Sequence, residues 1–178
     1  SITENADGLL DGTVKLEVQA SSPLADADLT YKWRRDGNII DGINGEVLVI
    51  DNIQYTDAGD YTVEISSFAG SVTSEIVPVR VIQPVSITTQ PIDASGVAGG
   101  SAVLAVSVIG TDPISYEWRR GGEKVEGGDN AYLTISDLSE SSGGEYQVVV
   151  SNPAGSVLSA TAILEIEIPP AITALTES

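Results

Sequence analysis

The sequence predicts an all-β protein built from two tandem β-sandwich domains of about 90 residues each. The strongest observation is an internal repeat, in which Tyr-Lys-Trp-Arg-Arg around Trp33 matches Tyr-Glu-Trp-Arg-Arg around Trp118. Downstream, Gly-Asp-Tyr61 matches Gly-Glu-Tyr146, and both pairs of residues are 85 positions apart. Glycine and proline also interrupt the chain at short intervals, without sustained helical periodicity between them. Short strands repeated in register are typical of β-sandwiches.

The expected strands follow in order along each copy. Residues 14–18 read Val-Lys-Leu-Glu-Val, which is the alternation of a half-buried strand, and residues 103–108 are a more apolar equivalent. Asp-Gly at 36–37 and Gly-Gly at 121–122 predict two-residue hairpin turns, because both turn positions favour positive φ. Only ten residues then lie between Gly37 and Leu48, so a fourth strand is expected to be little more than a loop.

The repeat also predicts the domain boundaries. Pro84, Ile87 and Thr88 recur 85 positions later near the end of the chain, whereas the first copy starts late within the stretch that corresponds to residues 85–91. We therefore expect the chain to be cut from a longer array. The predicted segments are a first domain with a truncated first strand (residues 1–82), a second domain (83–168), and the start of a third repeat or a tail (169–178).

The junction between the two copies predicts a stiff connection. Residues 79–87 contain no glycine and one proline, unlike a flexible Gly/Ser tether. One strand is expected to leave the first domain and almost directly become the first strand of the second, giving an elongated rod. The alternative is a linker that hinges freely about Gln83 and Pro84.

Charge and composition exclude several classes of function. The formal net charge is −18, with 26 acidic against 8 basic residues, and this field repels phosphate backbones and anionic lipids. We therefore expect no nucleic-acid partner. No apolar run approaches the roughly 20 residues of a membrane helix, so no direct membrane insertion is expected of this fragment. Cysteine is absent, which excludes disulfides and thiolate metal sites.

The chain resembles the immunoglobulin superfamily, specifically the cysteine-free, intermediate-set-like tandem repeats of bacterial surface and secreted proteins. The resemblance rests on a Trp in the third strand, on Gly-x-Tyr before the penultimate strand, and on the last hairpin, where Ser159 follows Pro-Ala-Gly-Ser. A run of alternating apolar residues also matches in the two copies, namely Leu48, Ile50 and Ile53 with Leu133, Ile135 and Leu138. The resemblance implies that each copy folds as a Greek-key, immunoglobulin-like β-sandwich.

The resemblance also implies a structural core in each domain. Trp33 and Trp118 would fill the space between the sheets, and Tyr61 and Tyr146 would form tyrosine corners. Relatives with a disulfide carry cysteines where this chain has valines, so apolar contact would replace the bridge. Those valines are Val18 and Val63 in the first domain and Val106 and Val148 in the second.

The side chains present do not favour catalysis. Histidine and cysteine are both absent, which removes the commonest general base and the thiol nucleophile, so we expect neither an enzyme nor a cofactor. Calcium is the one metal that the acidic loops suit, with Asp26 and Asp28 as candidates, although solvated acidic loops explain them better. Arg34 and Arg119 lie beside other arginines, and cross-strand pairing with nearby acids is the favoured interpretation.

Our interpretation is a non-catalytic module at an extracellular or cell-surface location. It would be a stiff spacer or adhesion segment of a longer tandem-repeat surface protein, monomeric within that chain, with an unidentified protein or glycan partner. The alternative is a carbohydrate-contacting accessory module of a secreted hydrolase, for which Tyr55, Tyr132 and Phe68 are the available aromatic residues. A titin-like intracellular elastic protein is a third reading, which the acidic excess and the short repeat do not favour.

Overall fold

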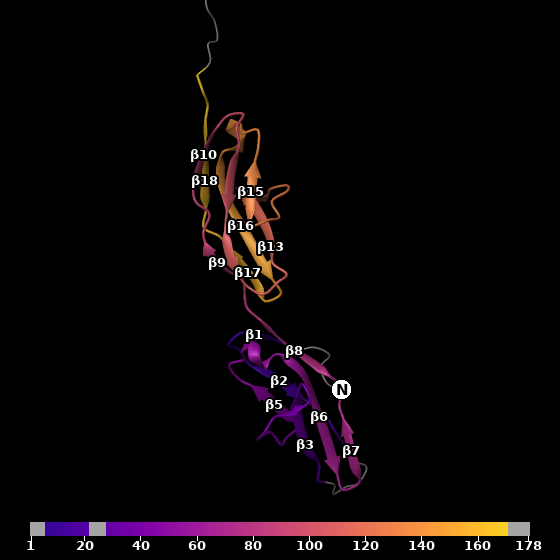
Figure 1. The fold of residues 1–178 in the computed structure, drawn as a ribbon. Helices are drawn as coiled ribbons and strands as arrows, with labels where there is room; N and C mark the ends of the chain where they lie inside the picture. Colours follow the sequence, from indigo (N-terminus) through magenta and orange to yellow (C-terminus); the bar gives the residue numbers. More distant parts are fainter. Residues whose placement is uncertain (1–5, 22–27, 171–178) are drawn as a thin grey trace, which may run out of the picture. The chain divides into compact units, whose positions relative to one another are not determined.

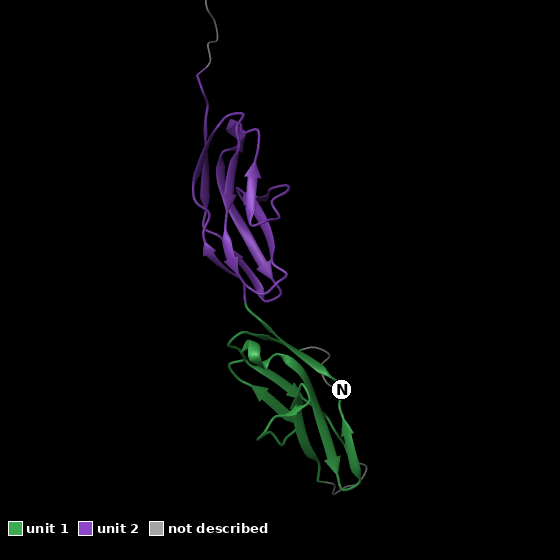
Figure 2. Ribbon diagram, in the orientation of Figure 1, with its two compact units in different colours: residues 1–83 green, residues 84–178 purple. Residues whose placement is uncertain are grey.

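The computed structural model describes residues 6–21 and 28–170 of the 178-residue chain. They belong to two compact units, residues 1–83 and residues 84–178 (Figure 2). Each unit is an immunoglobulin-like β-sandwich, so the predicted all-β fold of two tandem sandwiches is confirmed. The described residues contain no α-helix, and none of their helical turns is long and apolar enough to cross a membrane.

Unit 1 has a larger and a smaller sheet (Figure 1). The larger sheet has the order β1-β8-β6-β3-β4, with β7 also paired to β6, and the smaller one pairs β2 with β5. The elements are β1 (Ala6–Leu9), β2 (Val14–Glu17), β3 (Thr30–Arg35), β4 (Asn38–Ile39), β5 (Val47–Ile50), the 3-10 helix η1 (Tyr55–Asp57), β6 (Gly59–Ser67), β7 (Gly70–Thr73) and β8 (Val77–Ile82).

Unit 2 repeats this arrangement and adds one strand. Its larger sheet has the order β10-β18-β16-β13-β14, with β17 on β16, while β11 pairs with β15 and β12 pairs with the additional strand β9. The elements are β9 (Ser86–Thr89), β10 (Ala94–Val97), β11 (Ala102–Ala105), β12 (Ser107–Ile109), β13 (Ser115–Arg120), β14 (Glu123–Lys124), β15 (Tyr132–Ile135), η2 (Glu140–Ser142), β16 (Gly144–Asn152), β17 (Gly155–Leu158) and β18 (Ala162–Glu167).

The last strand of each sandwich pairs in parallel with a strand near the start of the same unit. In unit 1, β1 pairs with β8 in parallel from Ala6 opposite Val79 to Leu9 opposite Ile82. In unit 2, β10, the second strand of the unit after β9, pairs with β18 in parallel from Ala94 opposite Leu164. One edge of the larger sheet of each unit therefore joins an early strand to the last one.

A glycine in each of these early strands allows a close approach to the core. A Cβ atom on Gly96, in the middle of β10, would lie 2.3 Å from Cδ1 of Leu138. Its counterpart in β1, Gly8, would place a Cβ atom 2.5 Å from Cγ2 of Val14. Real Cβ atoms essentially never show such distances, so a larger residue at either position would require the contacting side chain or the strand to shift.

Local features of the hairpins follow from the sequence. The turn residues Asp36 and Gly37 have φ values of 50° and 80°, and Gly121 and Gly122 have 54° and 91°, as a two-residue turn requires. No strand lies between β4 and β5 or between β14 and β15, where the described backbone runs as a loop. The expected hairpin turns and the reduction of the fourth strand to a loop are both confirmed.

Each unit encloses its own apolar core. The indoles of Trp33 and Trp118 are 1% and 0% exposed, and each lies in a separate cluster of buried residues. Alternate residues of the strands supply these clusters, because successive side chains of a strand point to opposite faces. Large apolar side chains are thereby removed from water, which is the main stabilising contribution to either unit.

Candidate functional site

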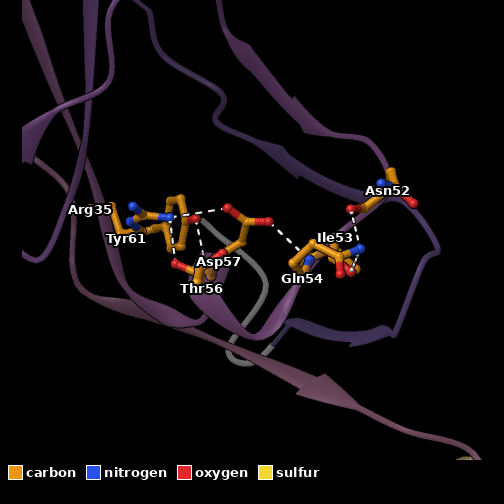
Figure 3. Close-up of polar contacts among 7 residues, drawn as sticks. All are labelled: Arg35, Asn52, Ile53, Gln54, Thr56, Asp57 and Tyr61. Carbon is orange, nitrogen blue, oxygen red and sulfur yellow. Dashed lines mark hydrogen bonds and ion pairs between the residues drawn. The ribbon is translucent and has the colours of Figure 1, made fainter.

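A cluster of mutually connected polar groups lies at the corner formed by η1 and the start of β6. Nη1 of Arg35 donates to the carbonyl of Thr56 at 2.8 Å and contacts Oδ1 of Asp57 at 3.1 Å. The hydroxyl of Tyr61 donates to the Asp57 carbonyl at 2.7 Å. Figure 3 shows Asp57 between Arg35 and Gln54, so this one residue joins β3, η1 and β6.

Both carboxylate oxygens of Asp57 are engaged. Oδ2 accepts a hydrogen bond of 2.9 Å from the backbone N–H of Gln54, which caps the start of η1, while Oδ1 faces Arg35. The side-chain amide of Gln54 in turn donates to the Asn52 carbonyl and to Oδ1 of Asp11. A carboxylate held by a cap and a guanidinium is a structural anchor rather than a free general base.

Tyr61 is held in its protonated form. Burial raises the pKa of its hydroxyl above the ordinary value, the carboxylates of Asp57 and Asp36 act in the same direction, and the Arg35 guanidinium opposes them. The side chain is 2% exposed. The hydroxyl therefore remains a hydrogen-bond donor throughout the physiological pH range, as the tyrosine corner requires.

The second unit builds the same corner without the ion pair. The Tyr146 hydroxyl donates to the Ser142 carbonyl at 2.7 Å, and Arg120 donates to the carbonyl of Ser141. Ser142 stands where unit 1 has Asp57, and its Oγ accepts from the Ser139 N–H at 3.1 Å. The cap and the tyrosine contact are thus common to both units, and the ion pair is specific to unit 1.

A shallow groove lies beside this corner in each unit, where the missing fourth strand leaves the sandwich open. In unit 1 it has a volume of about 490 Å³, with Arg35, Asp57 and Tyr61 along one side. Its other walls include Ile39, which is 50% exposed, together with Ile40, Asp41, Ile43 and Ile50. We call it the corner groove. It can accept an apolar group beside a positive charge, but among the described residues it holds no nucleophile paired with a base.

The corresponding groove of unit 2 differs in chemistry. Its volume is about 370 Å³, and Glu123 and Lys124 replace the Asn38 and Ile39 of unit 1. The corner groove of unit 1 is therefore the more apolar of the two. The two corners therefore differ both in the ion pair of Asp57 and in the residues that line the grooves beside them.

All eight residues expected to form the structural core are buried. Tyr61 and Tyr146 are both 2% exposed, and the four valines lie in the same clusters as the two indoles. Their exposed fractions are 6% for Val18, 0% for Val63, 6% for Val106 and 0% for Val148.

The arginines form ion pairs with nearby acids, one across neighbouring strands as expected and others within a strand or with η1. Nη2 of Arg34 lies 2.9 Å from Oε2 of Glu64 on the neighbouring strand, as predicted. Arg119 instead pairs along its own strand with Glu117, at 2.6 Å. Arg35 pairs with Asp57 of η1, at 3.1 Å. The adjacent arginines thus serve local structure, with no shared basic surface.

The calcium candidates are only partly described. Asp26 lies outside the described residues, and Asp28 is exposed. No group of three or more acidic side chains in the described part of the chain is arranged to hold a metal ion. The calcium hypothesis therefore remains a prediction about the loop between β2 and β3.

Two structural contacts were not predicted from the sequence. The indole Nε1 atoms of Trp33 and Trp118 donate to the carbonyls of Gly45 and Asn130, both at 2.9 Å. Backbone acceptors have no residue-type signature, although the two acceptors are 85 positions apart like the tryptophans. A search for equal spacing could have found them.

The second contact that was not predicted lies between the last two strands of each unit, β7 and β8 in unit 1 and β17 and β18 in unit 2. The Ser159 Oγ accepts from the Val148 N–H at 2.9 Å and donates to the Ala160 carbonyl at 2.8 Å. Ser74 makes the same two bonds with Val63 and Glu75. The identical serine in both copies was the available signal.

Sequence comparisons give a consistent picture. The model of the immunoglobulin domain family matches residues 84–152. The human cell adhesion molecule DSCAM is 29% identical over 136 residues, which cover 67% of this chain and 7% of that protein. Endoglucanase C of Cellulomonas fimi is also 29% identical, over 135 residues that cover 71% of this chain and 12% of the enzyme. The chain thus spans only a small part of either relative.

Solved structures share the fold at low identity. Extracellular domains 3–5 of Drosophila OTK align with a TM-score of 0.74 at 17% identity, covering 94% of this chain and 61% of that one. A three-domain structure of titin aligns with a TM-score of 0.71 at 20% identity, covering 93% and 63%. Together with the two closed sandwiches and their tyrosine corners, these similarities show that the chain has the fold of two tandem immunoglobulin-like β-sandwiches, and its sequence contains no cysteine.

Proposed function

We propose that this chain is a non-catalytic, force-resisting spacer within a longer extracellular or cell-surface protein, where it presents other parts of that protein to a protein or glycan partner. The observation that carries this proposal is the parallel pairing of the last strand of each unit with an early strand, β1 with β8 and β10 with β18. Tension on the ends of a unit pulls β1 and β8, or β10 and β18, in opposite directions along their length. The hydrogen bonds between them are then loaded together in shear.

Shear resistance is the property that a spacer under load needs. Strands that are peeled apart lose their hydrogen bonds one at a time, whereas strands that slide past each other must lose several at once. The four register pairs of β1 with β8 and the four of β10 with β18 place this arrangement between an early strand and the last strand of each unit. Their glycines, Gly8 and Gly96, press these strands against the core and oppose sliding further.

The polar groups support a structural role. Every buried side-chain nitrogen or oxygen in the described part of the chain has a hydrogen-bond partner. The arginines and carboxylates of the two corners brace the fold, and the charge of −18 keeps an exposed segment soluble while disfavouring nucleic acid. An extracellular location is supported by the similarity to a cell adhesion molecule and to the extracellular domains of OTK.

Single-molecule stretching of the full chain, held at its two ends, tests this proposal. We expect two separate unfolding events, one for each unit. The variant Gly96→Ala lowers the force of one event, because the added methyl group displaces β10 from Leu138. Gly45→Ala is the matched control, since a Cβ atom there has nothing within 4 Å. A wild-type chain that extends without resolvable unfolding events would overturn the proposal.

A carbohydrate-contacting accessory module is the second candidate, favoured by the similarity to endoglucanase C. Tyr132 is 59% exposed and lies on the outer face of the β11–β15 pair, near Val103, which is 57% exposed. A flat aromatic and apolar surface of this kind can stack against a sugar ring. Depletion of the full chain from solution by insoluble cellulose, lost in Tyr132→Ala, would favour this candidate over the spacer.

A further inference from the structure

The loop between β4 and β5 of unit 1 contains the only Asn-Gly pair of the sequence, at Asn44 and Gly45. Both residues are exposed, and neither belongs to a helix or a strand. Within the described part of the chain, the Gly45 N–H and the side-chain amide of Asn44 take part in no hydrogen bond. These two groups are therefore held neither by a sheet nor by a side-chain contact.

An asparagine followed by glycine can react with its own backbone. The Gly45 nitrogen gives up its proton and attacks Cγ of Asn44, and the side-chain nitrogen takes up a proton and leaves as ammonia. The product is a cyclic succinimide that includes the peptide bond. Water then opens this ring at either carbonyl and gives aspartate or isoaspartate, in which the chain continues through the β-carboxyl group. Glycine favours ring closure because it has no Cβ atom to shield its nitrogen.

The surroundings of Gly45 leave room for this reaction. A Cβ atom on Gly45 would have nothing within 4 Å, so no neighbouring group crowds this part of the backbone. Other asparagines of the described chain lack these conditions. Asn38 and Asn52 precede β-branched isoleucines, whose side chains shield the nitrogen, and Asn152 precedes a proline, which has no N–H.

Unit 2 supplies an internal reference at the same place in its fold. Asp129 and Asn130 stand 85 positions after Asn44 and Gly45, so the asparagine is shifted by one residue and is followed by Ala131. The alanine methyl group shields the nitrogen that would have to attack. The Asn130 side chain is also held, because its Nδ2 donates to Oδ1 of Asp129 at 2.9 Å. The repeat thus places a reactive and a far less reactive asparagine in matched loops of one chain.

The reaction acts directly on the contact that holds this loop to the core. The Gly45 carbonyl accepts the hydrogen bond from Trp33 at 2.9 Å, and the preceding Ile43 packs against the buried cluster of unit 1. The carboxylate of the following Glu46 accepts from a tyrosine hydroxyl of β3 at 2.9 Å. Because the chain is held on both sides of Asn44, the extra backbone atom of isoaspartate has to displace one of these contacts.

We propose that Asn44 deamidates spontaneously in the folded protein, and that the isoaspartate so formed releases the Gly45 carbonyl from Trp33. The buried indole N–H then lacks its acceptor, which destabilises unit 1. The change also adds one carboxylate to a chain whose formal net charge is already −18. It requires water and no enzyme, so it accumulates with the age of the protein. Unit 1 weakens with time while unit 2 retains its stability.

Timed incubation of the full chain at mildly alkaline pH, followed by peptide mapping with mass spectrometry, tests the first step. We expect Asn44 to gain the mass that distinguishes a carboxylate from an amide, in two chromatographically separate products, before Asn130 changes. The rate should rise with hydroxide concentration, because the Gly45 nitrogen has to lose its proton. Gly45→Ala should slow the reaction by about tenfold or more. An Asn44 amide that persists after a free peptide of residues 40–48 has fully converted would overturn the proposal.

NMR of the aged chain tests the second step. In the isoaspartate fraction, separated by chromatography, the indole N–H signal of Trp33 should move, whereas that of Trp118 should stay in place. Freshly prepared Asn44→Asp carries the new charge without the added backbone atom, so its Trp33 signal should keep the wild-type position. A Trp33 signal that is unchanged in the isoaspartate fraction, or that moves equally in Asn44→Asp, would contradict the release of the Gly45 carbonyl.

Discussion

The Nε1 atom of Trp33 donates a hydrogen bond of 2.9 Å to the carbonyl of Gly45, which ties the centre of the core to the loop that replaces the fourth strand. Trp118 and Asn130 repeat this contact at the same distance. In each unit the indole therefore has two roles, one in apolar packing and one as a donor to the loop that replaces the fourth strand. Backbone hydrogen bonds also hold this loop, as from the Trp118 N–H to the Gly128 carbonyl, so the indole and the neighbouring strand position it together.

Replacing Trp118 by phenylalanine should test this dual role. Trp118→Phe removes the donor, leaves the Asn130 carbonyl without that partner, and creates a small cavity. We expect the free energy of unfolding of unit 2 to fall by about 2–4 kcal/mol. The change is measured by urea unfolding of unit 2, monitored through hydrogen exchange of the backbone amides of that unit. The Trp33 fluorescence transition, which then reports on unit 1 alone, should stay at the wild-type urea concentration.

Ser159→Ala should destabilise the break in the last strand of unit 2. Ser159 is 4% exposed, and its loss would leave the buried Val148 N–H without its acceptor. The expected cost is about 1–3 kcal/mol, because an unsatisfied buried donor loses its hydration without compensation. Faster hydrogen exchange of the Val148 amide is the direct measurement. Ser156→Ala, at an exposed serine of β17, is the control and should leave this exchange rate unchanged.

Two substitutions of Asp57 should separate the cap from the ion pair. Asp57→Ser copies the corner of unit 2, where Ser142 caps η2 without an ion pair, so it should cost less than about 1 kcal/mol. Asp57→Ala removes both contacts and should cost about 1–2 kcal/mol, mainly through the lost cap. Urea unfolding of unit 1, monitored by Trp33 fluorescence in the Trp118→Phe background, measures the loss of stability in both variants. Equal losses in the two variants would show that the ion pair dominates.

The internal repeat made the core predictable, because a packed residue must recur wherever the same sandwich recurs. Trp33, Trp118, Tyr61 and Tyr146 were recognisable for that reason. The contact between Arg35 and Asp57 was not, since these residues are 22 positions apart and meet only when β3 and β6 pair and η1 turns back toward them.

The carboxylate of Glu64 should make the stability of unit 1 depend on pH. Its hydrogen bond from Arg34 lowers its pKa in the folded state, burial opposes this, and the charges of Lys32 and Arg34 add to the lowering. A depressed folded pKa means that the unfolded chain binds the proton more readily. The stabilisation is therefore fully present above the unfolded pKa of about 4.3 and is lost as pH falls through the lower folded value.

Glu64→Gln should flatten that pH dependence. Between about pH 5 and pH 3, the free energy of unfolding of unit 1 should fall less steeply in the variant than in the wild type. Glu75→Gln is the matched control, because Glu75 is exposed and takes no part in the ion pairs found between described residues. Urea titrations of dilute protein across this range, read by Trp33 fluorescence in the Trp118→Phe background, measure the slopes. A wild-type slope in Glu64→Gln, together with a flattened one in Glu75→Gln, would contradict the role of the Arg34 contact and point instead to the general loss of negative charge.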